Sequence, residues 1–170
     1  MGAGTTVLRV VVGGVFVAHG LQKLRGYWDG PGLEGTEKMM ESLEMHPAPL
    51  QARAVALAET VGGGALALGI ATPYAAAALI ATMVTAVRKV HLNNGFFNSK
   101  RGYEYNAVLA TAVLAVVADG PGVISVDAVG GNHRAGIGSA LFALVAGIAG
   151  SFFATGVASS LKPTAPAEDA

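Results

Sequence analysis

The chain alternates between long apolar stretches and short polar segments. A helix crosses the hydrocarbon layer of a membrane, about 30 Å thick, with roughly 20 mainly apolar residues. Five stretches approach or meet this length: Thr5–Leu24, Leu50–Ile70, Pro73–Val90, Tyr105–Ala118 and Ala135–Leu161. The fifth contains no formally charged side chain, as expected for a helix surrounded by lipid. The pattern therefore predicts an all-α membrane protein with five spans.

Residues that break helices lie between the predicted spans. Gly69 is expected to end the second span, and Thr72 with Pro73 offers an N-cap and a first helical position for the third. Because this link is so short, spans two and three must be antiparallel neighbours. The residues of 162–170 include two prolines and are expected to be a disordered tail.

The first polar segment has a helical pattern of its own over Thr36–His46. Met39, Met40 and Leu43 share one face, and three glutamates lie on the other. An acidic helix is not attracted to anionic lipid headgroups, so we expect it to rest on the bundle. It would be either a connecting helix or a lid.

Composition narrows the function classes. Apolar residues make up 52% of the 170 residues and charged residues 13%, which excludes an intrinsically disordered chain. The 11 basic and 11 acidic residues leave no basic excess, so a nucleic-acid partner is not expected. The chain has no cysteine, which excludes disulfides and thiolate metal sites. Its four histidines show no metal-ligand spacing, and no metal site is predicted.

The basic residues are distributed unevenly between the predicted loops. One side of the membrane receives eight of them and the other side one, Arg134. The eight are Lys23, Arg25, Lys38, Arg88, Lys89, Lys100, Arg101 and Lys162. Cytoplasmic loops carry the excess of Lys and Arg in multi-pass membrane proteins. The chain is therefore expected in the cell membrane, with its N-terminus outside and its C-terminus in the cytoplasm.

Ionisable residues inside or beside the spans are the candidates for a site. A charge at the bilayer centre costs about 2.5–3.5 kcal/mol on the most lenient scale, so it normally faces a partner or a cavity. Glu59 lies near the middle of span two and is expected to pair with Arg9 or to hydrogen-bond His19. The candidate ligand-binding cluster is Arg9, His19, Lys23, Glu59, Arg88, His91 and Glu104.

Other interpretations of these residues remain open. Lys23, Arg88 and Lys89 could simply extend to the lipid headgroups. An ion pair made by Glu59 could stabilise the fold without any reaction, and the histidines could be hydrogen-bonded core residues. Haem ligation by His19 and His91 is a further alternative.

A series of short motifs follows in order along the chain. They are Arg9…Gly14…Phe16…His19-Gly20…Lys23-Leu24, Glu59-x-x-Gly62-Gly63, Gly69-x-x-Thr72-Pro73, His91…Gly95-Phe96-Phe97, Gly102-Tyr103-Glu104-Tyr105 and Gly120-Pro121-Gly122…Ser125-x-Asp127. In this order they resemble the DoxX family of small integral membrane proteins, from about Val7 to Asp127. The resemblance implies a four-helix membrane bundle over residues 1–134, and the span within 135–161 is then an addition.

The resemblance also implies a link to membrane redox chemistry. One related subunit belongs to an archaeal thiosulfate:quinone oxidoreductase, and other members are associated with oxidative stress. On this sequence the matching polar positions would line the bundle and could hold a quinone head group or an oxyanion. No cofactor is expected within the chain itself apart from such a bound quinone. Electrons would have to come from a partner.

Three hypotheses of function follow. The first is a quinone- or sulfur-redox-linked subunit of a larger membrane assembly, in contact with the lipid bilayer and with other membrane or peripheral subunits or further copies of itself. The second is a non-catalytic membrane scaffold in which the charged cluster specifies the fold. The third is a small proton-coupled transporter that uses Glu59 and His19. Whether the chain is an enzyme is left open by the sequence.

Overall fold

The computed structural model describes residues 3–132 and 134–161. Within them the chain forms helices and no strand. The α-helices are α1 (Ala3–Arg25), α2 (Gly32–Ser42), α3 (Ala48–Leu68), α4 (Thr72–Ala86), α5 (Glu104–Asp119), α6 (Val126–Val129) and α7 (Ile137–Ser160). A π-helix, Val87–His91, continues α4. Short 3₁₀ turns lie at Tyr27–Asp29, Leu92–Asn94 and Asn98–Lys100. The predicted tail, residues 162–170, lies outside the described residues.

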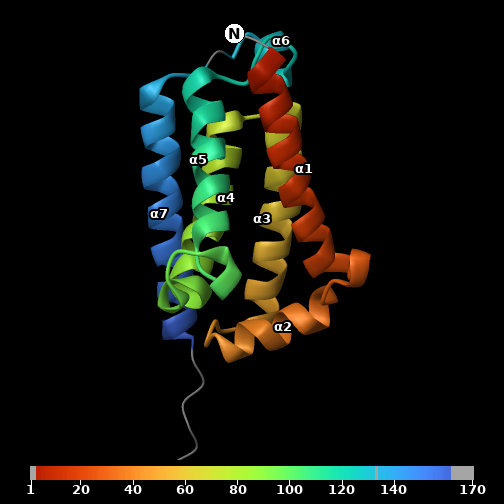
Figure 1. Cartoon of the computed structure of the whole chain (residues 1–170), viewed down its shortest axis with the longest axis vertical. Coiled ribbons are helices and arrows are strands. Elements are labelled where there is room, and N and C mark those ends of the chain that lie inside the picture. The colour runs from red at the N-terminus through yellow and green to blue at the C-terminus, as the bar shows by residue number, and fades with distance from the viewer. Residues whose placement is uncertain (1–2, 133, 162–170) are drawn as a thin grey trace, which may run out of the picture.

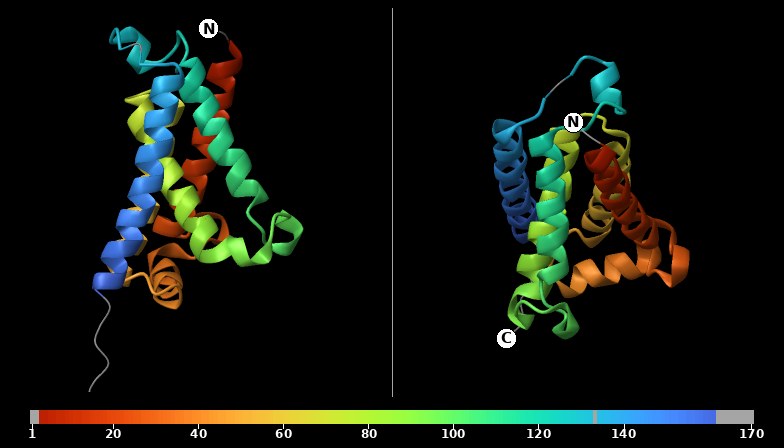
Figure 2. Two further views of the ribbon diagram at one scale, coloured as in Figure 1. Left: turned by 90° about the vertical axis from the view of Figure 1, so that its left-hand side faces the viewer. Right: turned by 45° about the horizontal axis from the view of Figure 1, so that its top comes forward.

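The five long helices stand side by side in one bundle (Figure 1). α1 packs on α3, and α4 contacts α3, α5 and α7. α2 crosses one end of the bundle, where it contacts α1 and α3. At the opposite end lie the start of α1 and the short helix α6 (Figure 2). We call these the α2 end and the α6 end.

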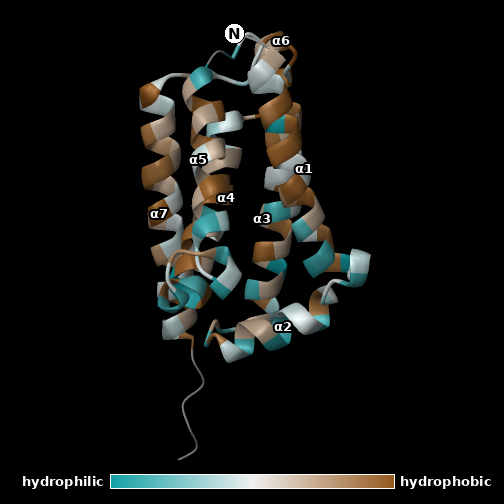
Figure 3. Cartoon of the chain, in the orientation of Figure 1, coloured by the Kyte–Doolittle hydropathy of each residue, from teal (hydrophilic) through white to brown (hydrophobic). Residues whose placement is uncertain are grey.

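The bundle is that of an all-α membrane protein, a four-helix unit extended by a fifth long helix. In the described part of the chain, three segments are long and apolar enough to cross a membrane: Ala3–Arg25, Thr72–Asn94 and Ile137–Ser160. α5 has only 16 residues, and α3 carries Arg53 and Glu59 within its 21 residues. Apolar residues cover long parts of the helices, whereas hydrophilic residues gather at the α2 end (Figure 3).

Small residues on α7 let this helix approach α4 closely. Ala143, Gly147 and Ser151 are buried and recur every four residues along α7. A Cβ atom at Gly147 would stand 2.6 Å from the Cβ of Ile80 on α4. This is a steric clash, so at this separation of the helices the position accepts only glycine. The small-residue face of the fifth helix therefore serves packing within the chain.

Three helix ends differ from the sequence prediction. The helix predicted over Thr36–His46 begins earlier, at Gly32, and ends at Ser42, because the chain turns at Leu43 and Glu44 takes a positive φ of 56°. Gly69 ends α3 with a φ of 66°, as predicted. Thr72 is the first residue of α4 and not its N-cap, which is Ala71.

A carboxylate from a distant segment binds the start of α4. Asp127 accepts hydrogen bonds from the backbone N–H groups of Ala71 and Thr72, both at 2.9 Å, and from the Thr72 hydroxyl at 2.7 Å. Burial favours the protonated carboxyl, but these hydrogen bonds outweigh it, so the pKa of Asp127 lies below its ordinary value of 3.8. Negative charge at a helix N-terminus is also favoured by the helix dipole. Asp127 thus fixes the α6 segment to α4.

Candidate functional site

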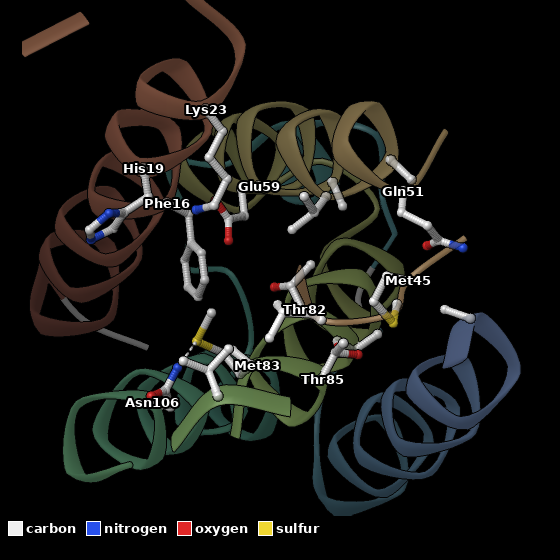
Figure 4. Close-up of a pocket in the computed structure, with 18 of the residues that line it drawn as sticks. Phe16, His19, Lys23, Met45, Gln51, Glu59, Thr82, Met83, Thr85 and Asn106 are labelled. Carbon is white, nitrogen blue, oxygen red and sulfur yellow. Dashed lines mark hydrogen bonds and ion pairs between the residues drawn. The ribbon is translucent and has the colours of Figure 1, made fainter. Parts of the chain in front are cut away.

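A cavity of about 650 Å³ lies inside the bundle, towards the α2 end. Its walls come from α1, α3, α4 and α5. Residues of α2 close it at the α2 end, and residues of α7 form part of one side. Most lining side chains are apolar, among them Phe16 and Leu109. Figure 4 shows these side chains around the space, with Lys23 and Glu59 on one side and Asn106 across from them. The volume and the apolar lining suit a small organic ligand.

An ion pair lies in the wall of this cavity. Lys23 on α1 donates from Nζ to Oε2 of Glu59 on α3 at 2.5 Å, and their side chains are 21% and 5% exposed. The expected partners of Glu59, Arg9 and His19, are therefore wrong. Lys23 lies near the end of α1 that is level with Glu59, because α1 and α3 run antiparallel, whereas Arg9 lies about 20 Å further along the helix.

Two histidines contribute to the cavity from different sides. His19 on α1 packs edge-on against Tyr105 on α5, with ring centroids 6.1 Å apart. His91, at the end of the π-helix, has its Nδ1 2.7 Å from the carbonyl oxygen of Arg101. Each histidine lines the cavity, so both imidazoles are placed where a ligand could reach them. π-Helical turns inside α-helices occur frequently at functional sites.

The other three candidate residues lie away from the cavity lining. Arg9, near the α6 end, is 3% exposed and donates to the carbonyl oxygens of Ala67, at 2.5 Å, and Ile124. Its guanidinium therefore ties α1 to the end of α3 and to the loop before α6. Glu104 accepts a hydrogen bond from the backbone N–H of Asn98 at 2.9 Å and so holds the loop before α5.

Arg88, the third of them, binds the fifth helix. Its Nη1 donates to the hydroxyls of Ser151 and Thr155 at 3.2 and 3.3 Å, and its guanidinium lies 3.7 Å from the ring centre of Phe152. The structure thus brings His19, Lys23, Glu59 and His91 to one cavity and gives Arg9, Arg88 and Glu104 bonds elsewhere in the fold. As ligand-binding residues, all seven remain predictions.

The cavity also contains polar residues that the sequence did not single out. Gln51 is 9% exposed, and its amide has no hydrogen-bond partner among the described residues. Asn106 donates only to the sulfur of Met83, at 3.5 Å. An uncharged amide in an apolar helix is only a weak indication of a site. The candidate residues were chosen for their charge or their imidazole ring, and these two amides were therefore not among them.

Methionine side chains form a flexible part of the cavity lining. The four within the described residues, Met39, Met40, Met45 and Met83, all line the cavity. Two of them belong to α2, so the helix predicted to rest on the bundle does so with its methionine face towards the cavity. Unbranched thioether side chains adapt to ligands of different shape. The spacing of apolar residues in the sequence predicted this face of α2, but it did not predict the cavity that the face covers.

The donor set fits a quinone head group better than an oxyanion. The carbonyl oxygens of a quinone accept hydrogen bonds, and Lys23 and His19 can supply donors beside apolar walls that suit the ring. His91 donates its Nδ1–H to the carbonyl oxygen of Arg101, which leaves its Nε2 as an acceptor. An oxyanion would need a surplus of positive charge, but Glu59 already balances Lys23. In the described part of the chain, no group of three His, Asp or Glu residues is placed to hold a metal ion.

The bundle is that of an α-helical membrane protein, and a partly buried ion pair lies in the wall of its internal cavity. The DoxX family model matches residues 4–92, and the chain belongs to the DoxX family. The match covers α1 to the π-helix, whereas the motifs had extended the resemblance to Asp127. The chain is 29% identical to "Putative oxidoreductase CatD" of Bacillus subtilis (strain 168) over 113 residues, 66% of this chain and 78% of that protein. No solved structure matches the chain.

Proposed function

We propose that the chain binds the head group of a membrane quinone in the cavity and acts as a redox-linked subunit of a larger membrane assembly. The observation that carries this proposal is the Lys23–Glu59 pair in the wall of an otherwise apolar cavity of about 650 Å³. The name of the Bacillus subtilis relative supports an oxidoreductase context. A sulfur oxyanion is the less suitable ligand, because the charge of Lys23 is already neutralised.

The chain's own residues would bind and orient the head group. Lys23 donates hydrogen bonds, and Glu59 accepts one from Lys23 and so holds the ammonium group in the wall of the cavity. His19 adds a donor or an acceptor, according to which ring nitrogen holds the proton, and His91 adds an acceptor at Nε2, because its Nδ1–H donates to the carbonyl oxygen of Arg101. A bound quinone supplies the capacity to take up two electrons and two protons. Because the chain lacks cysteine, it has no thiolate-held cluster of its own, and we propose that a partner subunit delivers the electrons.

Titration of the purified protein in lipid nanodiscs with a tail-less naphthoquinone tests this proposal. We expect saturable binding to the wild type and an affinity at least tenfold lower for Glu59→Gln, because the substitution removes the negative charge that holds Lys23 in place. Glu34→Gln is the matched control, since Glu34 forms an exposed pair with Lys38 at 2.7 Å on α2.

Three results would oppose the proposal. They are an absence of quinone binding by the wild type, equal affinities of the wild type and Glu59→Gln, and saturable binding of thiosulfate in place of the quinone. The measurement does not depend on the electron-donating partner, because it records binding and not turnover.

We further propose that the α2 end faces the cytoplasm and that the chain lies in the cell membrane. In the described residues the α2 end carries Lys23, Arg25, Lys38, Arg53, Arg88, Lys89, Lys100 and Arg101, whereas Arg9 and Arg134 lie towards the α6 end. This asymmetry is that of the positive-inside rule.

The lack of cysteine makes the orientation directly measurable. In intact cells, a maleimide that does not cross membranes should label Val129→Cys, which lies on α6 where Val129 is 88% exposed. Ser42→Cys, exposed at the end of α2, should be labelled only after permeabilisation. The reverse pattern would show the opposite orientation.

A further inference from the structure

One side of the cavity opens between α3 and α7. Small residues of three helices line this side: Ala54 and Ala58 from α3, Ala78 and Ala81 from α4, and Gly150 and Ala154 from α7. Ala54 lines the cavity and is itself exposed, while Ala154 and Gly150 are half-buried. The cavity therefore reaches the outer surface of the bundle here. We call this part the α3–α7 groove.

The amide of Gln51 lies where the α3–α7 groove meets the α2 end of the bundle. Gln51 is in the first turn of α3, at the α2 end, and Figure 4 shows its amide directed towards the gap between α3 and α7. The residue is nine-tenths buried, yet the amide has no hydrogen-bond partner within residues 3–132 and 134–161. The low exposure belongs to the residue as a whole, and its amide N–H groups are free to donate to a molecule in the groove.

We propose that the α3–α7 groove binds one acyl chain of a bilayer phospholipid, whose ester carbonyl accepts a hydrogen bond from Gln51. On a membrane protein, a groove that reaches the outer surface of the bundle would meet bilayer lipid, and its alanines and Gly150 leave room for a hydrocarbon chain. Gln51 lies in the first turn of α3, at the end of the bundle where hydrophilic residues gather, and in a bilayer this position would lie near the ester groups. This site does not rest on the proposed quinone function, although the chain and the head group would share one cavity.

The same arrangement gives the fifth helix a role beyond packing. α7 follows the part of the chain that the family model matches, and it supplies one wall of the groove through Gly150 and Ala154. A bulky side chain at Ala154 would fill the groove, because this position lines the cavity. Ala149 is exposed on α7 and lies outside the cavity lining. The same substitution there would place the bulky side chain outside the bundle and leave the groove open.

Photo-crosslinking in nanodiscs tests the proposal. The probe is a phosphatidylcholine with a diazirine in one acyl chain, and mass spectrometry of the digested protein locates the labelled residues. In the wild type we expect label concentrated on Ala54, Ala58 and Gly150, compared with exposed residues on the outer face of α7. Ala154→Phe should lower the groove label at least fivefold, and Ala149→Phe should leave it unchanged.

A second variant tests the hydrogen bond from Gln51. Gln51→Leu keeps the groove apolar but removes the amide, so it should also lower the groove label at least threefold. Label spread evenly over the lipid-facing helices, or groove label that survives both Ala154→Phe and Gln51→Leu, would overturn the proposal. Suppression of the label by a long-tailed quinone, but not by a tail-less one, would assign the groove to the quinone tail and overturn the phospholipid. Loss of quinone binding with the groove label intact would leave this inference standing.

Discussion

Gly13→Ala is expected to destabilise the bundle by about 3 kcal/mol, the upper end of the usual cost of overpacking. A Cβ atom at Gly13 on α1 would stand 2.5 Å from the carbonyl oxygen of Gly63 and 2.7 Å from the backbone nitrogen of Ala67, both on α3. Neither atom can rotate away, because both belong to the helix backbone. The two helices would have to separate along their contact, which is also the wall that carries Lys23 and Glu59.

The neighbouring glycine provides the control. A Cβ at Gly14 would have no heavy atom within 4 Å, and alanine restricts the unfolded chain more than glycine does. Gly14→Ala should therefore stabilise the helix by about 0.5–1 kcal/mol. Thermal unfolding of both variants in one detergent gives the comparison. Equal midpoints for Gly13→Ala and Gly14→Ala would show that the close approach of α1 and α3 is not needed for stability.

The sequence predicted the helices well because their signal is local. Apolar runs and helix-breaking residues gave the five long helices to within two residues at each end, when the π-helix Val87–His91 is counted with α4. The end of α3 at Gly69 was predictable because a positive φ favours glycine. The start of α4 was predicted to within one residue. The carboxylate that binds it was not, since Asp127 lies 55 residues further along the chain.

The partners of the charged residues were less predictable, because these contacts join segments that are far apart in the sequence. Arg9, Lys23 and Glu59 were all recognised as unusual within apolar helices. Which cation meets Glu59 depends on how far α1 is shifted along α3, and that shift is set by the contact of Gly13 with Gly63 and of Gly20 with Thr60. Glycines in a single sequence indicate that helices approach closely, but they do not identify the partner helix. The cavity, which needs all the long helices in place, could not be derived from any one of them.

Substitutions of Lys23 and Glu59 distinguish two roles of this ion pair, stabilising the fold and binding a quinone head group. Removing one member of a buried ion pair leaves the other charge without a partner and typically costs about 3–5 kcal/mol. Glu59→Met leaves an ammonium in an apolar wall. Lys23→Met leaves a carboxylate that is only 5% exposed. Each single variant should therefore lower the unfolding midpoint clearly.

The double variant Lys23→Met/Glu59→Met should behave differently. Two apolar side chains of similar volume leave no unpaired charge, and such replacements are often neutral or stabilising. We expect the double variant to recover to within about 1 kcal/mol of the wild type. The exposed pair of Glu34 and Lys38 is the control, since removing Glu34 from it should change stability by less than about 1 kcal/mol.

Quinone binding by the double variant then decides what the pair does. A pair that serves only the fold would leave the cavity of a stable double variant able to bind the tail-less naphthoquinone with wild-type affinity. A pair that binds the head group would leave a protein that folds normally and binds at least tenfold more weakly. We expect the second result, because the pair is the strongest hydrogen-bonding group in a wall that is otherwise mainly apolar. Folding and binding are thus separated in one protein, without knowledge of the partner that supplies electrons.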